Sequence, residues 1–215
     1  MPDLKKPTYA EQIYEDIKKD ILNNRIGFNQ KLTNRDLQQK YGVSSTPVRD
    51  AINKLYLDGF VSEINNSGAR TTSFDRTYAL EINEIVSMLA DDAIALSAMR
   101  SDIKDVSKML SEKIGMQTAN IDNDGFFQYD DEFHLVFFRN SGNDSFLQLY
   151  ERYNILRQIL VRYTDGKSKA DRQNALQQHV LIFKAYEKGD IILARERMHD
   201  HYRTAMVKIE KGFNE

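Results

Sequence analysis

The amino-acid sequence predicts a mainly α protein, in which an N-terminal winged helix-turn-helix (residues 1–75) precedes a C-terminal all-α helical bundle (residues 76–215). Three observations support this prediction. Apolar residues recur at helical spacing along most of the chain. Two short runs rich in β-forming residues flank an Asn- and Gly-containing turn near residue 66. The 215 residues are enough for two domains that each bury a core.

The first predicted helix begins after Thr8. Thr8 and Glu11 have the spacing of a capping box, in which each side chain accepts a hydrogen bond from the backbone of the other residue. The apolar positions that follow share one helical face, which is typical of a helix packed on a core: Tyr9, Ile13, Ile17 and Ile21. A second helix is expected from Thr33, with Asp36 in its first turn, to Gly42.

A third helix is predicted from Pro47 to about Leu57. Proline is tolerated at the first helical position because its missing N–H would have no partner there, so Thr46 is the expected N-cap. Gly59 is expected to close the helix, and one face of it is apolar: Val48, Ala51, Ile52 and Leu55. Hydroxyl groups and an arginine at such a helix start suit DNA, because helix N-termini favour anions.

The next segments complete the predicted architecture. The runs FVSEI and RTTSF flank the turn sequence NNSGA, which predicts a two-stranded wing. From about residue 77 the periodicity is helical, and polar or glycine-bearing breaks divide it into six long stretches. They lie near residues 77–100, 103–119, 124–140, 144–164, 169–188 and 190–212.

Composition excludes several classes of protein. Hydrophobic residues make up 41% of the chain and charged residues 29%, with no apolar run of membrane length and no signal sequence, so a cytoplasmic location and no membrane partner are expected. The absence of cysteine excludes disulfides, zinc ribbons and cysteine nucleophiles. Any metal site must use His, Asp or Glu. A net charge of −2 argues against a general polyanion binder, although local charge matters more.

The sequence from Gly42 to Val61 resembles a known family. Its GVSSTPVRDAI run is similar to the GVSRTPVREAL pattern of the winged helix-turn-helix in the GntR superfamily of bacterial transcription regulators. The later run DDEFHLVFFRNSGN resembles the DxxFHxxL and SGN elements of the all-helical FCD effector domain in the FadR branch. The resemblance covers nearly the whole chain. Six helices rather than seven would place it nearer the VanR-like subgroup.

The resemblance implies a set of DNA-binding residues. Four match positions that contact DNA in the family, and Ser45 stands where the family usually has arginine: Arg35, Ser45, Thr46, Arg49 and Gly68. The residue pattern agrees for Arg35, Thr46 and Arg49, which lie at the starts of two consecutive helices and can face one groove. The alternative is that Arg49 is a solvated residue and Thr46 only a cap. The expected arrangement is a homodimer on a double-stranded operator with an inverted repeat.

Four residues of the second half form a candidate metal site. Asp130 and His134 are four residues apart and share an apolar helical face, and His179 and His201 occupy similar stripes. His199 lies about 200° around the helix from His201, so it is not expected to join them. One carboxylate and three imidazoles suit Zn²⁺, with Ni²⁺ or Mn²⁺ as alternatives. The resemblance implies the same four ligands; for any single histidine, the alternative is a hydrogen-bonded core residue.

The resemblance also implies a small organic or sugar acid as effector. The related domains often carry an Arg-x-x-Leu-Glu element, whereas this chain has Val86 and Ala90 at the corresponding positions. Arg157 and Arg162 are candidate partners of an effector carboxylate; their alternative is a place on a solvated helix face.

The sequence therefore predicts a DNA-binding transcriptional regulator, and specifically a repressor released by a small carboxylate metabolite. In one alternative, the bound metal is itself the signal. A metal-dependent enzyme is the weaker alternative, because no general base and no second catalytic motif accompany the metal site.

Overall fold

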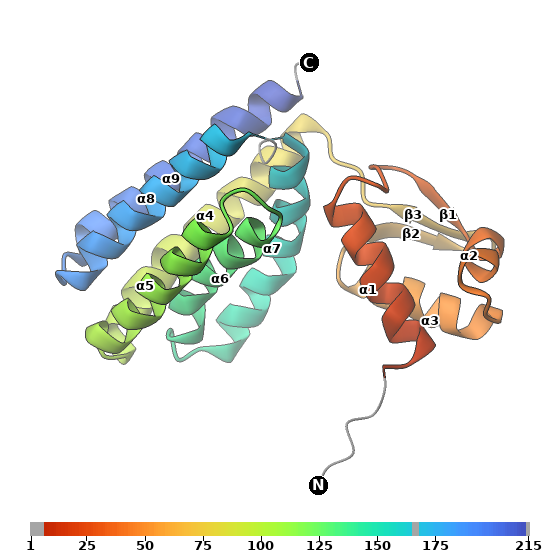
Figure 1. Cartoon of the computed structure of the whole chain (residues 1–215), viewed down its shortest axis with the longest axis horizontal. Helices are drawn as coiled ribbons and strands as arrows, with labels where there is room; N and C mark the ends of the chain where they lie inside the picture. Colours follow the sequence, from red (N-terminus) through yellow and green to blue (C-terminus); the bar gives the residue numbers. More distant parts are fainter. Residues whose placement is uncertain (1–6, 165–167, 214–215) are drawn as a thin grey trace, which may run out of the picture. The chain divides into compact units, whose positions relative to one another are not determined.

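The computed structural model describes residues 7–164 and 168–213, and of residues 162–164 only the backbone. The chain divides into two compact units between Asp75 and Arg76 (Figure 1). The predicted fold class is confirmed: a mixed N-terminal unit with a small sheet is followed by a purely helical unit in the described chain.

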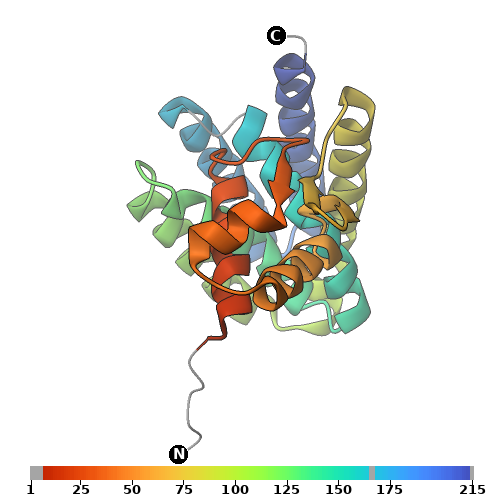
Figure 2. The same ribbon diagram turned by 90° about the vertical axis from the view of Figure 1, so that its right-hand side faces the viewer.

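The N-terminal unit combines three helices with a three-stranded antiparallel sheet (Figure 2). In chain order its elements are α1 (Tyr9–Leu22), β1 (Lys31–Thr33), α2 (Asn34–Tyr41), α3 (Ser45–Leu57), β2 (Val61–Asn65) and β3 (Gly68–Thr71). The strands lie in the order β1-β3-β2. The sequence predicts only β2 and β3. It misses β1 because three residues carry no periodicity, and only the pairing with β3, in which Lys31 lies opposite Arg70 and Thr33 opposite Gly68, reveals the strand.

In the N-terminal unit, two of the three helices begin where the capping residues predict. Thr8 and Glu11 form the expected capping box, and Thr33 accepts a hydrogen bond from the backbone N–H of Asp36. The predicted start of α3 is wrong, because the helix begins two residues earlier at Ser45, after Ser44. Proline at the third position is compatible with this start, since none of the first N–H groups of a helix has an intrahelical partner.

Helix α3 is held by its apolar face. It packs against α1 and α2 and against both wing strands. The side chains that meet there are almost completely buried, so the helix is anchored on one side only: Ile13, Ile17, Val48, Ala51, Ile52, Leu55 and Phe60. Burying each large apolar side chain stabilises the unit by about 1.5–3 kcal/mol.

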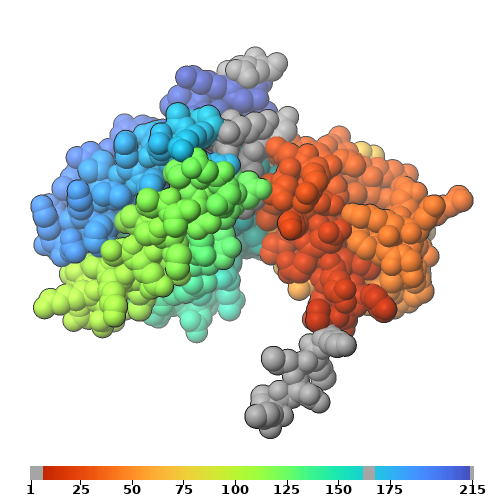
Figure 3. All heavy atoms as spheres, in the orientation of Figure 1, coloured from red at the N-terminus to blue at the C-terminus, as the bar shows by residue number. Residues whose placement is uncertain are grey.

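The described part of the C-terminal unit contains six helices, close to the six predicted stretches. They are α4 (Arg76–Arg100), α5 (Ile103–Ala119), α6 (Gly125–Arg139), α7 (Asp144–Thr164), α8 (Lys169–Glu187) and α9 (Ile191–Gly212). Helix α4 packs against α9, α7 and α6, while α8 packs against α9 and α5. Figure 3 shows the outer surfaces of α5 in lime green and α8 in light blue side by side.

Aromatic side chains fill much of the bundle interior. The rings of Phe138 and Tyr150 stack at 3.7 Å between centroids, and Phe137 meets Tyr186 edge to face at 5.3 Å. Such pairs contribute about 0.5–1.5 kcal/mol beyond the burial of their surface. These ring pairs join α6, α7 and α8, and two of these helices, α6 and α8, carry His134 and His179. None of the described helices combines the length and apolar character needed to cross a bilayer.

Candidate nucleic-acid interface and candidate metal centre

The predicted DNA-binding side chains of α2 and α3 are all exposed. Arg35 lies in the first turn of α2, while Ser45, Thr46 and Arg49 lie in the first five residues of α3. Arg49 follows the fully buried Val48, and its side chain is exposed. The solvated start of α3 therefore offers two hydroxyl groups and one guanidinium group.

The charged groups of this surface differ from two other cations of the unit, Arg25 and Lys40. Arg25 and Lys40 form ion pairs with Asp20 at 2.8 and 3.2 Å. By contrast, Arg35 and Arg49 make no side-chain hydrogen bond or ion pair with any residue that the structure describes. Their donors are thus available to an anionic partner at no cost in broken ion pairs.

A polar hollow lies between α3 and the wing. It has a volume of about 200 Å³, and amide side chains dominate its lining, which includes Arg49, Asn34, Asn53, Asn65, Asn66 and Gly68. Amide and guanidinium groups are suited to base edges and to phosphate oxygens. The hollow therefore extends the candidate interface from the helix to the wing.

Gly68, which the resemblance places among the DNA-binding residues, has no exposed surface comparable to that of the other four. It is buried at the start of β3 with φ +150°, and a Cβ atom there would lie 1.9 Å from the carbonyl oxygen of Leu32. The structure thus requires glycine for the close approach of β1 and β3. The turn residues Asn66 and Ser67, by contrast, are exposed.

Three of the predicted metal ligands converge in the C-terminal unit. His134 from α6, His179 from α8 and His201 from α9 each offer one ring nitrogen, and these atoms all lie within 4.8 Å of one another. The ring centroids are 4.8 to 5.2 Å apart, and all three side chains are buried. Three imidazoles from three helices are a donor set that a divalent transition metal prefers.

The environment keeps these histidines neutral. Burial lowers the pKa of His179 to about 3, with Arg157 acting in the same direction. Burial also lowers the pKa of His134 and of His201 well below the ordinary value, assisted by the neighbouring imidazoles. A neutral imidazole keeps the lone pair that a metal ion needs.

The hydrogen bonding of the cluster tests whether an ion fits. Both ring nitrogens of His134 and Nε2 of His179 are buried without a hydrogen-bond partner among the described residues. A buried polar atom left in this state costs about 1–3 kcal/mol. A divalent ion coordinated by Nε2 of His179 and by one ring nitrogen of His134 would remove that cost at both coordinating atoms, so the residues present fit a metal.

Asp130 lies at the edge of the cluster. Its Oδ1 is 3.7 Å from Nε2 of His179, and its Oδ2 is 3.7 Å from Nη2 of Arg157. The carboxylate is therefore shared between the histidines and a buried cation. His199 is outside the cluster and lines a separate surface groove between α4 and α9.

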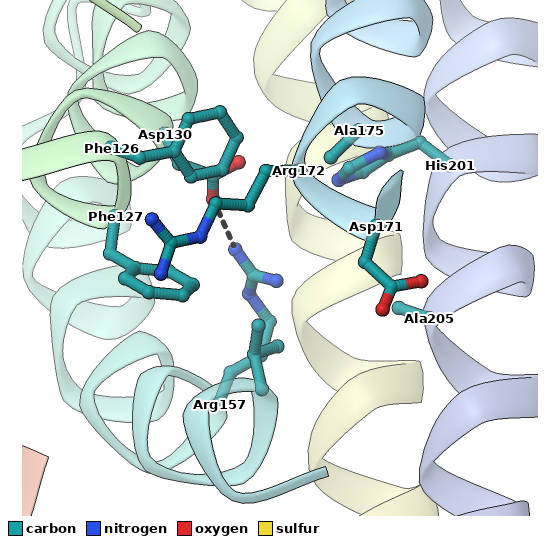
Figure 4. A pocket seen from close by; sticks show the side chains of 10 residues that line it. Phe126, Phe127, Asp130, Arg157, Asp171, Arg172, Ala175, His201 and Ala205 are labelled. Atoms are coloured by element: carbon teal, nitrogen blue, oxygen red, sulfur yellow. Dashed lines mark ion pairs between the residues drawn. The ribbon is translucent and has the colours of Figure 1, made fainter. Parts of the chain in front are cut away.

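A small cavity opens beside His201 and Asp130 (Figure 4). Its volume is about 40 Å³, and its lining is Phe126, Phe127, Asp130, Arg157, Val161, Asp171, Arg172, Ala175, His201 and Ala205. Arg157 is buried and points toward Asp130, which places the first predicted effector-binding arginine in the cavity. Arg162 belongs to α7, but its side chain lies outside the described residues.

Arg172 is a cavity residue that the sequence prediction missed. Its guanidinium carbon lies 5.0 Å from the ring centroid of Phe127, and its Nη1 donates to the carbonyl oxygen of Asn123 at 2.9 Å. The sequence could have indicated Arg172, because it lies seven residues before His179 and therefore shares a helical face with it.

The depressed histidine pKa values predict how stability depends on pH. In metal-free protein, the unfolded chain binds protons at its histidines below pH 6.5, whereas the folded cluster does not. The free energy of unfolding is thus at its full value above pH 6.5. It decreases as the pH falls toward the pKa values of the three histidines in the folded protein, by up to ~1.4 kcal/mol per pH unit per histidine. Urea unfolding of chelator-treated protein from pH 7.5 to 5 measures it; constant stability over this range would contradict the prediction.

Comparison with known proteins relates both units to characterised domains. The model for "Bacterial regulatory proteins, gntR family" matches residues 9–70, and the model for the FCD domain matches residues 81–204. The HTH-type transcriptional regulator YdhC of Bacillus subtilis is 25% identical, over 93% of this chain and 90% of that protein. The HTH-type transcriptional repressor RspR of Escherichia coli is 26% identical, over 89% and 84%. The solved structure of E. coli McbR/YncC shares the fold, with a TM-score of 0.76, 17% identity and coverage of 97% and 100%.

Proposed function

Because this chain belongs to the gntR family of bacterial regulatory proteins and carries an FCD domain, we propose that it is a repressor released from its operator by a small carboxylate metabolite. The family and the relatives are transcriptional regulators and not enzymes. The similar RspR is named as a repressor, which supports the proposed sign of regulation. A regulator of this kind acts in the cytoplasm, where its DNA is.

The DNA-binding assignment rests on one observation, the pair of exposed arginines without intramolecular partners at the starts of α2 and α3. Arg35 and Arg49 can contact phosphates or a guanine edge without first losing an ion pair. Thr46 and Ser45 add short hydroxyl donors beside them. Gly68 contributes through the shape of the wing, because no side chain fits at its position.

A single winged helix contacts few bases, so we propose a homodimer on an inverted repeat. Two copies related by a two-fold axis read the same half-site twice. The molar mass of the complex on a selected operator tests this proposal. A complex containing one chain per operator would reject it.

In the C-terminal unit, His134, His179 and His201 would hold the ion, and Asp130 would complete the set. Zn²⁺ fits these nitrogen and oxygen donors best, and Ni²⁺ or Mn²⁺ are alternatives. The bound ion would supply a positive charge that attracts an anionic ligand. Buried Arg157 supplies a second positive charge in the same cavity.

The cavity size narrows the choice of effector. A volume of about 40 Å³ corresponds to roughly three water-sized positions, which favours a small organic acid over a sugar acid. Phe126 and Phe127 restrict the cavity on one side, and Arg172 lies across their rings. A ligand of a few heavy atoms can therefore contact the ion site and Arg157 together.

Operator release by a metabolite is tested with DNA selected from a random library. Fluorescence anisotropy is then measured with metal-loaded protein across a panel of small mono- and dicarboxylates. A fall in affinity with one of these acids is expected. If free metal alone changes DNA affinity and none of the acids does, the protein is instead a metal-responsive regulator.

The affinity for DNA should also fall steeply with salt. The chain has a net charge of −2, so only a local basic surface can hold DNA, and contacts to phosphates release counterions. The expected slope of log affinity against log salt is about −0.9 for each phosphate neutralised. Anisotropy titrations from 50 to 300 mM salt measure the slope, and a value near zero would show that the winged helix is not the binding surface.

A further inference from the structure

Two glutamines contact His179 and His201, which are called the outer histidines of the cluster below. Nδ1 of His179 lies 3.0 Å from Oε1 of Gln117, and Nδ1 of His201 lies 2.8 Å from Oε1 of Gln178. Gln117 is completely buried and comes from α5, a helix that offers no histidine to the cluster. Each pair joins a ring nitrogen that faces away from the ion site to a neutral amide.

The direction of the first hydrogen bond follows from the other end of the amide. Nε2 of Gln117 donates to Oδ1 of Asp130 at 3.3 Å. An ionised carboxylate only accepts hydrogen bonds, so the amide nitrogen must face Asp130 and the amide oxygen must face His179. His179 therefore carries its proton on Nδ1, and the lone pair of its Nε2 is left for the cluster.

The second glutamine is oriented in the same way. The Thr204 hydroxyl donates to the backbone oxygen of Asp200 at 2.9 Å, so it can only accept from Nε2 of Gln178, which is 3.0 Å away. Oε1 of Gln178 then accepts the Nδ1 proton of His201. His179 and His201 are thus each fixed in one tautomer by chains of hydrogen bonds that involve α5, α6, α8 and α9. The inner histidine, His134, has no such partner among the described residues.

We propose that Gln117 and Gln178 are positioning residues that hold His179 and His201 in the Nδ1–H tautomer before an ion binds. This inference rests on the proposed metal site. Hydrogen bonds of this kind orient the ring and increase the basicity of the ligating nitrogen. A glutamine accepts the Nδ1 proton without adding a third carboxylate beside Asp130 and Asp131. Burial already raises the pKa of the Asp131 side chain.

Gln117 has a further role in this arrangement. One amide contacts both a predicted carboxylate ligand and a predicted imidazole ligand, so it sets Asp130 and His179 relative to each other. It also connects α5 to α6 and α8. Loss of this amide is therefore expected to weaken the ion site more than loss of Gln178.

The tautomers can be measured in metal-free protein by two-bond ¹H–¹⁵N correlation spectra of the imidazole rings. The chain has only four histidines, so assignment with single His→Gln variants is direct. Wild type should show His179 and His201 protonated on Nδ1. Gln117→Met should change the pattern of His179 only, and Gln178→Met that of His201 only. Protonation on Nε2 in wild type, or unchanged patterns in both variants, would overturn the proposal.

Zinc affinity provides the second measurement, by competition with a chromophoric chelator. Gln117→Met and Gln178→Met should weaken zinc binding by about 10- to 100-fold. Gln178→Glu should stay within a few-fold of wild type, because a carboxylate still accepts the Nδ1 proton. Gln148→Met, on the exposed face of α7, is the matched control and should not change the affinity. Wild-type affinity in both Met variants would reject the positioning role.

These measurements also separate this inference from the proposed function. If wild type binds no divalent ion, the proposed metal site fails, while the metal-free spectra still decide the tautomers. If wild type binds zinc but the spectra show Nε2–H, the metal site stands and the positioning role is rejected. Should Gln117→Met not fold, the half-buried Gln178 and its Met and Glu variants decide the outcome.

Discussion

Replacing Arg49 by alanine is expected to reduce specific operator binding to the level of non-specific binding. A bidentate contact to guanine contributes ~1–3 kcal/mol of discrimination, and a two-fold dimer loses it in both half-sites, which gives ~2–6 kcal/mol. The folded unit should be unaffected, because Arg49 is exposed and has no partner among the described residues. Anisotropy with selected and scrambled DNA measures the first effect, and thermal unfolding the second.

Arg25→Ala is the matched control for this experiment. Arg25 is also an exposed arginine of the N-terminal unit, but it lies outside α2 and α3 and forms an ion pair with Asp20 at 2.8 Å. Its loss should leave operator affinity unchanged. Thr46→Ala should weaken binding only mildly and without loss of stability, since α3 begins at Ser45 and Thr46 is not its cap. A large fall in melting temperature for Arg49→Ala would contradict the assignment.

The second large effect is expected from the three clustered histidines. If the proposed metal site is correct, alanine at His134, His179 or His201 should reduce bound metal to well below one ion per chain, because each residue offers one of its few ligand atoms. The variants should also lose the stability that the bound ion contributes. Elemental analysis of the purified proteins measures occupancy, and thermal unfolding with and without chelator measures the stabilisation.

His199→Ala is the matched control, since it removes a histidine from the same helix as His201. His199 lines the groove between α4 and α9 and lies outside the cluster, so this variant should keep its metal. Full occupancy in the His179 or His201 variant would reject the site as described. Loss of metal from the His199 variant would show that the angular argument places the wrong face of α9 inward.

The sequence predicted those parts of the fold that depend on periodicity and capping. The six helices of the second unit and the hairpin follow from such local patterns. Strand β1 could not be predicted, because three residues form a strand here only through pairing with β3. The start of α3 was misplaced because a threonine before proline looks like a cap, although proline is also accepted at the third position.

Local patterns also predicted one part of the candidate metal site, whereas contacts between helices could not be predicted. Helical angles are enough to place His201 inward and His199 elsewhere, because both belong to one regular helix. They cannot show that Asp130 is shared with Arg157, or that Gln117 reaches His179 from α5. Those contacts depend on how separate helices pack, and no spacing within one helix encodes them.

The approach of Gly68 to Leu32 limits how this regulator can acquire a new operator. Any side chain at position 68 would collide with the backbone of β1, so this position cannot diversify without separating the strands. Asn65 is also constrained, since its Oδ1 accepts hydrogen bonds from Ser67. Asn66 is exposed at the same turn and holds no such bond through its side chain among the described residues. Evolution, or a designer's library, can therefore vary wing recognition mainly at one residue.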